Sequence, residues 1–373
     1  MGAAQNTTDN YMRRALALAN RAEGMTAPNP LVGCVIVRDG EIVGEGWHKG
    51  PGRDHAEVMS IKDAGPRARG ATAYVTLEPC NHTGRTPPCT AAILKAGIAD
   101  VVYGMADPNP DAAGGAAFLN DHGVTASRDT LMEPACRGAN KFWCSRIERG
   151  QPYIIGKIAM SLDGRIATKT GDSKWITSAK ARTHAHGLRG AVDAILVGAD
   201  TVIADDPALT ARDGEQIKFP LRVVLDSTGR TSPGAAVYDR AGRGAVLITT
   251  ARTPAKKREQ FTAHGVEVLI AETDHQGRPD IDHVIEFLHA RGVNGLLVEG
   301  GAEIHASFLS AGYYDEVWTY IAPKFIGANG RPAIGDLGLE KLNDAQSAML
   351  ATSTQLGPDR LVIAKLSEMS EAF

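Results

Sequence analysis

The chain has 373 residues, of which 43% are apolar and 22% are charged, a composition typical of a soluble globular protein. Lys and Arg number 40 and Asp and Glu 43, so the net charge of −3 gives no broad basic field and argues against a dedicated nucleic-acid binder. No run of about 18 apolar residues is present, which argues against a membrane span, and the length predicts two domains rather than one.

The first half of the chain alternates helical and strand patterns. Helices are expected at residues 9–23, from residue 55 onwards, and at 90–95, 111–121 and 131–146. Strands are expected at residues 31–37, 41–47, 71–77 and 99–104. Asp39-Gly40, between the first two strands, indicates a hairpin. This alternation predicts an α/β domain, residues 1–149, in which helices cover a sheet.

A candidate metal site lies within this half. His55-Ala56-Glu57 is followed by Glu78-Pro79-Cys80 and, after eight further residues, by Cys89. Zinc with three protein ligands keeps its fourth position for water and lowers the pKa of that water towards neutrality. A nearby carboxylate can then move protons between the water and a leaving amine. The pattern H-x-E…P-C-x-x-C is the signature of zinc nucleobase deaminases, so His55, Cys80 and Cys89 are the predicted ligands and Glu57 is the predicted catalytic residue.

The spacing between the two cysteines departs from that signature, because eight residues separate them instead of two. Two cysteines and a histidine could also be unrelated members of the core, since free cysteine is often a small buried apolar residue. The local sequence favours a site. Asp54 is expected to cap a helix beginning at His55, and Pro87-Pro88 suits the start of a helix with Cys89 at its N-terminus. A helix N-terminus favours thiolate over thiol, as a metal ligand requires.

A domain boundary is expected at residues 148–152, so the second domain covers residues 150–373. Its strands are expected at residues 153–159, 194–197, 221–225, 245–248, 266–270, 295–298 and 316–321. Helical stretches lie between several of these strands. The second half is therefore also predicted to be α/β, with a mostly parallel sheet.

A glycine-rich turn is the main chemical signal of the second half. No G-x-G-x-x-G sequence follows an expected strand, so a standard Rossmann dinucleotide site is not supported. Instead, the strand ending at Val298 runs into Glu299-Gly300-Gly301 and then into a helical stretch. Paired glycines at such a turn let a phosphate approach free backbone N–H groups. A tight turn that binds nothing is the simpler explanation of these residues taken alone.

Short motifs follow one another in a recognisable order along nearly the whole chain. In the first half these are residues 28–33 (PNPLVG), 55–57 (HAE) and 78–89 (EPCNHTGRTPPC). In the second half they are residues 161–165 (SLDGR), 173–177 (SKWIT), 198–210 (GADTVIADDPALT) and 298–301 (VEGG). Residues 9–147 and 151–370 thereby resemble the two halves of the bifunctional deaminase/reductase family of riboflavin biosynthesis. The long insert between the cysteines is peculiar to that deaminase branch.

The resemblance implies a cytidine-deaminase-like first domain and a dihydrofolate-reductase-like second domain, with zinc and NADPH as cofactors. By the same resemblance, NADPH would be contacted by Ala159, Trp175, Thr201, Asp205, Ser227 and Gly301. The substrate of the reductase would be contacted by Ser173, Arg189, Leu209, Arg212 and Glu299. The substrate of the deaminase would be contacted by Asn29, His48 and Arg85. Asp205 is in addition a candidate for proton handling in the reductase.

The implied function is a two-step conversion in riboflavin synthesis. The first domain would deaminate 2,5-diamino-6-(5-phosphoribosylamino)pyrimidin-4(3H)-one and release ammonia. The second would use NADPH to reduce the ribosyl group of the product to ribityl, giving 5-amino-6-(5-phosphoribitylamino)uracil. Hydride transfer is the chemistry of the cofactor, so the protein mostly orients the two partners.

Three alternatives remain open from the sequence. One is a deaminase of another base, such as guanine or tRNA adenosine, with an unrelated second domain. Another is a deaminase fused to a reductase-like domain without activity. The third is a binding or regulatory protein with a structural zinc, against which Glu57 argues because a structural site needs no acid–base residue.

The expected location is the cytoplasm, and the expected partner is a small pyrimidine ribotide, with neither nucleic acid nor membrane involved. Residues 1–7 lack the apolar segment of a signal peptide, and five cysteines make a poor disulfide framework. Cys34, Cys136 and Cys144 are expected to be core or surface thiols without a role. A homo-oligomer, either a dimer or a tetramer, is expected.

Overall fold

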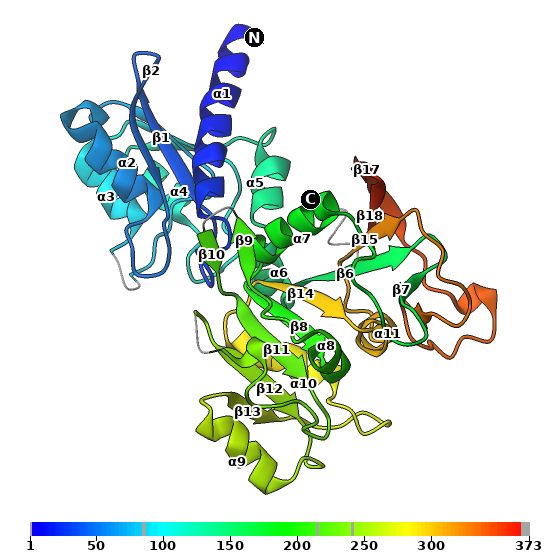
Figure 1. Ribbon diagram of the computed structural model, residues 1–373. Coiled ribbons are helices and arrows are strands. Elements are labelled where there is room, and N and C mark those ends of the chain that lie inside the picture. The colour runs from blue at the N-terminus through cyan, green and yellow to red at the C-terminus, as the bar shows by residue number, and fades with distance from the viewer. Residues whose placement is uncertain (1, 84–86, 214–215, 240–241, 367–373) are drawn as a thin grey trace. The chain divides into compact units, whose positions relative to one another are not determined.

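The computed structural model describes residues 2–83, 87–213, 216–239 and 242–366 (Figure 1). These residues form two compact units that divide between Gly150 and Gln151. Each unit is a mixed α/β structure with its own sheet and its own hydrophobic core, as predicted.

The first unit contains a five-stranded sheet in the order β2-β1-β3-β4-β5. Its strands are β1 Gly33–Arg38, β2 Glu41–Trp47, β3 Thr72–Val75, β4 Asp100–Tyr103 and β5 Thr125–Arg128. Its helices are α1 Gly2–Ala19, α2 Ala56–Ala64, α3 Cys89–Ala96, α4 Gly115–Asp121, α5 Glu133–Ala139 and α6 Lys141–Arg149, with short 3₁₀ turns after α1 and α2. The strands β1 and β2 form the predicted antiparallel hairpin, whereas β3, β4 and β5 are parallel.

Close packing of helix on sheet explains the glycine at the start of β1. A Cβ atom on Gly33 would lie 2.0 Å from the carbonyl oxygen of Ala15 in α1, so only glycine lets the two backbones approach this closely. The core beneath contains Met12, Leu18, Ile36, Val75 and Val101, all fully buried. The packing of α1 and α2 against this hairpin fixes the start of α2, where the candidate metal site begins.

Three local features of the first unit differ from the sequence prediction. The strand β5 was not predicted, because its short sequence is polar and mostly exposed. The single helix expected at residues 131–146 is broken at Asn140, whose buried side chain exchanges hydrogen bonds with the backbone N–H and C=O of Leu31. Asp54 does not cap α2: His55 itself occupies the N-cap position, and the Asp54 carboxylate binds Lys62 at 2.6 Å.

The second unit contains a nine-stranded sheet in the order β13-β12-β11-β8-β14-β6-β15-β18-β17. Its strands are β6 Tyr153–Ser161, β8 Ala194–Gly198, β11 Leu221–Leu225, β12 Ala245–Thr249, β13 Glu267–Ile270, β14 Gly295–Gly300, β15 Glu316–Ala322, β17 Met349–Leu356 and β18 Asp359–Lys365. Two small pairs are formed by β7 Arg165–Ala167 with β16 Arg331–Pro332 and by β9 Ala211–Asp213 with β10 Gln216–Lys218. Its helices are α7 Ala179–Ala191, α8 Ala199–Asp205, α9 Ala255–Ala263, α10 Ile281–Ala290 and α11 Ala302–Ser310.

The seven strands predicted for this half are all present, and they pair in parallel from β13 to β15. The antiparallel hairpin of β17 and β18 at one edge was missed, because β17 has no continuous apolar run and is almost wholly exposed. Figure 1 shows β8, β11, β12 and β13 side by side, with α8 beginning directly after β8. The carboxyl ends of parallel strands lie at one edge of a sheet, which is where ligands of such folds bind.

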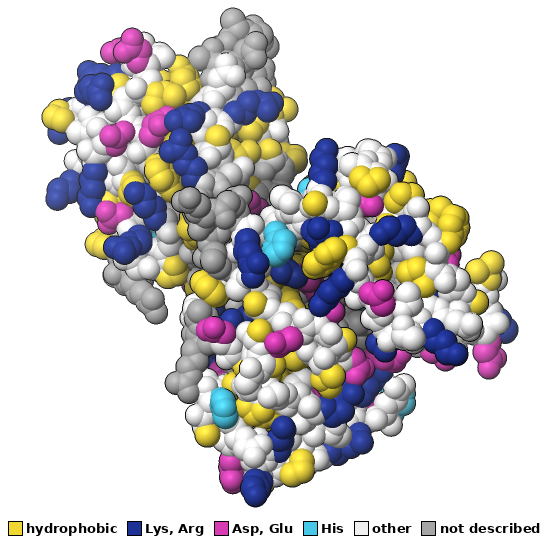
Figure 2. Space-filling model, in the orientation of Figure 1, with side chains coloured by type: hydrophobic (Ala, Val, Ile, Leu, Met, Phe, Trp, Pro, Cys, Tyr) yellow, Lys and Arg dark blue, Asp and Glu magenta, His cyan; other side chains and the backbone are white. Residues whose placement is uncertain are grey.

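Charged side chains of both signs are interspersed over the visible face of the molecule, with no broad field of one sign (Figure 2). This agrees with the near balance of 40 basic and 43 acidic residues. Within the described part of the chain, none of the helices combines the length and the apolar character needed to cross a membrane.

Candidate active sites

The predicted metal ligands meet at the N-termini of two helices. His55 is the N-cap residue of α2, and Cys89 is the first residue of α3, directly after Pro88. The His55 Nδ1 atom lies 3.1 Å from Cys89 Sγ and 3.6 Å from Cys80 Sγ, and all three ligand atoms lie within 4.8 Å of one another. Zinc bonds of about 2.0 Å to nitrogen and about 2.3 Å to sulfur put tetrahedral ligands at roughly this separation. The donor set therefore fits zinc.

The thiols of Cys80 and Cys89 differ in acidity. Hydrogen bonds from the Cys89 side chain, and then from His55, lower the pKa of the Cys80 thiol, so Cys80 is the one that ionises first. The Cys89 backbone N–H, at the start of α3, also points at Cys80 Sγ at 3.4 Å. This N-terminus favours the thiolate form that a metal ligand needs.

Glu57 lies beside the ligands and is not one of them. It is in the first turn of α2, only 4% exposed, and lines a cavity of about 390 Å³ together with His55 and Cys80. Burial first, and then the charge of Cys80, raise the pKa of Glu57 to about 7. A carboxyl group with a pKa near neutrality suits proton transfer in both directions.

The other carboxylate of the motif, Glu78, has a positioning role that the sequence analysis did not recognise. Its two oxygens accept hydrogen bonds from the backbone N–H groups of Asp107 at 3.2 Å and Ala116 at 3.0 Å. A Cβ atom on Gly115 would lie 1.7 Å from the carbonyl oxygen of Pro79, so α4 abuts the Glu78–Cys80 segment directly. The position of Glu78, immediately after an apolar strand and before a proline and a ligand, is the signal that could have revealed this role.

The rest of the deaminase cavity contains predicted and unpredicted residues. Asn29 Nδ2 lies 3.0 Å from His48 Nε2, and His48 Nδ1 lies 3.2 Å from the carbonyl oxygen of Asp54, so His48 can donate to Asp54 and accept from Asn29 as a neutral ring. Burial lowers the pKa of His48, which favours this neutral form. Arg85, the third predicted substrate contact, lies outside the described residues. Polar residues in the lining that were not predicted are Arg53, His82, Asp107, Asn109 and Arg146.

A second cavity, of about 540 Å³, lies at the carboxyl ends of the parallel strands of the second unit. Of the residues that the resemblance assigns to NADPH or substrate, those in its lining are Ala159, Ser173, Thr201, Asp205, Ser227, Glu299 and Gly301. Four assigned residues are not in the lining: Trp175, Arg189, Leu209 and Arg212. Trp175 is 62% exposed, with the guanidinium of Arg182 at 4.4 Å from its ring centroid, and Leu209 is 2% exposed.

The glycine turn fits a dinucleotide. Gly301 is the N-cap of the nine-residue helix α11 and lines the cavity. The first N–H groups of a helix have no partner within the helix, so this end of α11 suits a phosphate group. Gly300 has φ +96°, and a Cβ atom there would lie 2.8 Å from His305 Nε2. The turn therefore requires glycine at position 300.

A group of charges at the end of β14 forms the polar wall of this cavity. Glu299 accepts Arg189 Nε at 2.5 Å and Arg189 Nη2 at 2.8 Å, and Lys157 Nζ lies 3.9 Å from the same carboxylate. Burial alone would raise the pKa of Glu299, but Arg189 and Lys157 outweigh it and bring the pKa to about 2. Arg189 is absent from the cavity lining and binds Glu299, so it holds the Glu299 carboxylate in position.

Lys157 was missed by the sequence analysis, although it lines the cavity from β6. Burial lowers its pKa, which makes its ammonium group a better proton donor than an exposed lysine. The sequence feature that could have revealed Lys157 is a single charged residue inside the apolar run Tyr153-Ile154-Ile155-Gly156-Lys157-Ile158. Asp205, the predicted proton carrier, lies in the same lining and pairs with Lys174 at 3.4 Å.

Glu299→Gln is expected to destabilise the second unit by about 3 kcal/mol, because it leaves Arg189 and Lys157 without their buried partner. Since the folded pKa of Glu299 lies below its ordinary value of 4.5, its stabilising effect is complete above that pH and is lost as the pH falls towards about 2. The variant should therefore lose stability at neutral pH and show a weaker pH dependence below about 4.5 in urea unfolding. Glu303→Gln is the control, since that side chain is 66% exposed, and an equal loss in both variants would contradict the argument.

The two sites define the class of the protein: a zinc-dependent deaminase joined to a reductase that uses a nicotinamide dinucleotide. Comparison with known families agrees, since residues 5–105 match the cytidine and deoxycytidylate deaminase zinc-binding region and residues 152–361 match the RibD C-terminal domain. The chain is 43% identical to the riboflavin biosynthesis protein RibD of Bacillus amyloliquefaciens, over 94% of each chain. It is 42% identical to RibD of Escherichia coli, over 94% of this chain and 96% of the relative. The chain belongs to the RibD family of riboflavin biosynthesis.

Solved structures lead to the same family. A structure of RibD from Acinetobacter baumannii matches with a TM-score of 0.88 and 33% identity, covering 98% of this chain and all of that one. A Thermotoga maritima structure, described as a diaminohydroxyphosphoribosylaminopyrimidine deaminase/5-amino-6-(5-phosphoribosylamino)uracil reductase, matches with a TM-score of 0.86 and 32% identity, with the same coverage of this chain. The predicted fold class, family and cofactors, zinc and NADPH, are thereby confirmed. The alternative of an unrelated second domain is excluded by the match over residues 152–361.

Proposed function

We propose that this chain converts 2,5-diamino-6-(5-phosphoribosylamino)pyrimidin-4(3H)-one into 5-amino-6-(5-phosphoribitylamino)uracil in two steps. The observation that carries the proposal is the occurrence, in one chain, of two complete cavities of different chemistry. One holds His55, Cys80 and Glu57, and the other holds Glu299 and Gly301. The Thermotoga maritima relative is named for both activities.

In the first step, water replaces the amine at C2 of the pyrimidine and ammonia leaves. His55, Cys80 and Cys89 would hold a zinc ion, which would supply an activated water for this replacement. Glu57 takes the proton of the water and delivers it to the leaving nitrogen, for which its buried position beside the ligands is suited. The neutral His48 and its partner Asn29 form the pocket wall that holds the pyrimidine.

In the second step, the ring-opened sugar is reduced at C1′. NADPH bound in the second cavity would supply the hydride, and the residues of the protein orient the sugar and provide the proton. Lys157 is better placed than Asp205 to give that proton, since it is the cation with the lowered pKa in the cavity wall. Glu299, held by Arg189, then contacts the sugar hydroxyls, and Arg212 is an exposed guanidinium available to the phosphate.

The direct test is incubation of the zinc-loaded protein with the diaminopyrimidine ribotide, with and without NADPH, followed by mass spectrometry. Without NADPH, we expect one product that has lost an amine and gained an oxygen. With NADPH, we expect a second product with two additional hydrogens. Deamination without reduction at saturating NADPH would support the alternative of an inactive reductase-like domain, and ammonia release from free guanine would support a different deaminase.

Separation of the chain after Gly150 is expected to give two pieces that each keep one activity. The motivation is that the two cavities are lined by residues 28–147 and 157–333, on opposite sides of the proposed division between domains 1–149 and 150–373. The N-terminal piece should deaminate, and the C-terminal piece should oxidise NADPH only with deaminated substrate. A folded C-terminal piece that never oxidises NADPH would show that the reductase needs residues from the first half.

We also propose a cytoplasmic homo-oligomer, either a dimer or a tetramer. The five cysteines are all free, which suits a reducing compartment. The edge strand β17 exposes Met349 and Leu350, at 48% and 63%, and an open edge of this kind is suited to pairing with another chain. Light scattering after size-exclusion chromatography would give the subunit number, and a monomer would contradict the proposal.

A further inference from the structure

His305 is a buried histidine of the reductase cavity that has no part in the proposed reaction. It lies on α11, is 3% exposed and lines the cavity. Its Nδ1 atom lies 2.7 Å from the hydroxyl oxygen of Tyr314, a residue that is only 2% exposed. A buried polar group needs a hydrogen-bond partner, so each of these two side chains depends on the other for its place in the interior.

The His305 ring contacts the two strands that carry Lys157 and Glu299. A Cβ atom on Gly300, the residue after Glu299 in β14, would lie 2.8 Å from His305 Nε2 and 3.0 Å from its Cδ2. The ring also forms a hydrogen bond to the backbone of Lys157 in β6. Because this bond favours the protonated ring, the ring is its donor and the Lys157 carbonyl oxygen its acceptor. One side chain therefore contacts both strands where their charged residues meet.

The ring is neutral and holds one particular tautomer. Burial, followed by the charge of Lys157, lowers the pKa of His305 to about 4. A neutral imidazole has one nitrogen that donates and one that accepts. Burial raises the pKa of Tyr314 above its usual range, so its hydroxyl group stays protonated and can donate to His305 Nδ1. Donation by Tyr314 places the ring N–H on Nε2, which is the nitrogen left for the Lys157 carbonyl.

Tyr314 is itself fixed by the strand that carries Lys157. A Cβ atom on Gly156, the residue before Lys157, would lie 2.9 Å from Tyr314 Cε1, so glycine there lets the tyrosine ring pack directly on β6. The residue after Tyr314 is tied to the same strand, since the backbone N–H of Asp315 donates to the Ile154 carbonyl oxygen at 2.9 Å. The Asp315 carboxylate in turn accepts the backbone N–H of Ile154 at 2.7 Å. The tyrosine, the histidine and the backbone of Lys157 thus form one connected unit.

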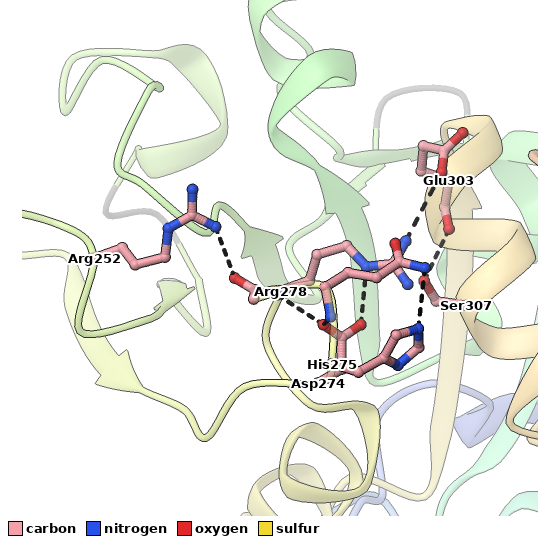
Figure 3. A network of polar contacts seen from close by, with 8 residues as sticks. Arg252, Asp274, His275, Arg278, Glu303 and Ser307 are labelled. Atoms are coloured by element: carbon pink, nitrogen blue, oxygen red, sulfur yellow. Dashed lines mark hydrogen bonds and ion pairs between the residues drawn. The ribbon is translucent and has the colours of Figure 1, made fainter.

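Figure 3 shows the contacts that hold the exposed side of α11, where Arg278 lies between Asp274 and Glu303. Arg278 Nε donates to Asp274 Oδ2 at 2.9 Å, and Arg278 Nη1 lies 3.8 Å from Glu303 Oε2. The Glu303 side chain is 66% exposed, so its pair with Arg278 is weak. These contacts join α11 to the loop before α10 and not to β6, so the connection to Lys157 is made by the buried side of the helix.

We propose that His305, in the tautomer set by Tyr314, is a positioning residue of the reductase. It fixes the backbone of Lys157 against the turn that follows Glu299, so that the ammonium group and the carboxylate face the same point of the sugar. A displacement of about 1 Å in such a site can cost about 10²-fold in rate. His305 acts through these two residues and leaves the affinity for NADPH unchanged. The inference rests on the proposed reductase activity.

The experiment measures NADPH oxidation by the zinc-loaded full chain, with deaminated substrate, in three variants. His305→Ala removes the whole ring, and we expect kcat to fall about 10- to 100-fold with the KM for NADPH changed less than about twofold. Tyr314→Phe removes only the hydroxyl group that sets the tautomer, so kcat should fall about 2- to 10-fold. His305→Gln keeps a donor and an acceptor on one side chain and should restore kcat to within about fivefold of the unchanged protein.

Tyr320→Phe is the matched control, because it changes a second buried tyrosine–histidine pair of the same unit. The Tyr320 hydroxyl oxygen lies 2.9 Å from His184 Nδ1, Tyr320 is 1% exposed, and neither residue lines the cavity. Urea unfolding should show similar losses of stability in the two phenylalanine variants, whereas only Tyr314→Phe should lower kcat. If His305→Ala does not fold, the comparison of Tyr314→Phe with Tyr320→Phe decides the question.

Three results would overturn the inference: a folded His305→Ala protein with normal kcat, an equal fall in kcat in both phenylalanine variants, or a rise in the KM for NADPH alone. Failure of the proposed function would appear separately, as an unchanged protein that does not oxidise NADPH with deaminated substrate.

Discussion

The Glu57→Gln protein is expected to retain its zinc and to deaminate about 10²–10⁴ times more slowly, because it has lost the group that moves protons to the leaving amine. The amide has nearly the same size as the carboxyl group, so the buried position in α2 stays filled. Glu57 is also outside the ligand set, which is why the metal should remain. Steady-state deamination rates and zinc analysis on the same preparation test both halves of this expectation.

Two controls accompany this variant. Glu41→Gln makes the same chemical change on an exposed residue of β2 and should leave deamination unaltered. NADPH oxidation with deaminated substrate should be normal in both variants, since the second cavity lies wholly within residues 157–333. A zinc-replete Glu57→Gln protein with full deaminase activity would remove Glu57 from the mechanism.

The candidate metal site could be predicted because its ligands lie in two short sequence motifs, residues 55–57 and 78–89. His55 and Cys89 each lie at a helix N-terminus, and Pro87-Pro88 indicated the second of these although Asp54 does not cap the first. A nitrogen and two sulfurs are donors that zinc prefers. Glu78 could not be assigned in the same way. Its partners, the N–H groups of Asp107 and Ala116, are 29 and 38 residues away and become neighbours only when β3, β4 and α4 pack.

In the fold, too, features that depend on nearby residues were predicted, whereas features that depend on contacts between distant residues were not. Buried parallel strands such as β8 and β11 are continuous apolar runs and were predicted, whereas the exposed strand β17 has no such pattern. The break at Asn140 depends on hydrogen bonds to Leu31, 109 residues earlier, which no helical pattern reveals. Lys157 is an intermediate case, because a charge within an apolar strand indicates burial but does not identify its partner Glu299.

Replacement of a zinc ligand is expected to have the largest effect on the first activity. Cys89→Ser exchanges a soft thiolate for a hard hydroxyl oxygen, which zinc bound by His55 and Cys80 accepts poorly. Even changes to residues that only support metal ligands cost about 10- to 100-fold in metal affinity or activity, so loss of a ligand should cost more than about 100-fold. We therefore expect the purified variant to contain little zinc and to show almost no deamination.

Cys34→Ser is the matched control for Cys89→Ser, because Cys34 is also fully buried and lies outside the ligand set. It should keep its zinc and its deaminase activity, apart from a small packing cost. Cys80→Ser should behave like Cys89→Ser, and all three variants should still reduce deaminated substrate with NADPH. Metal analysis that finds as much zinc in Cys89→Ser as in Cys34→Ser would mean that Cys89 is a core cysteine, and that the unusual eight-residue spacing belongs to a site with a different third ligand.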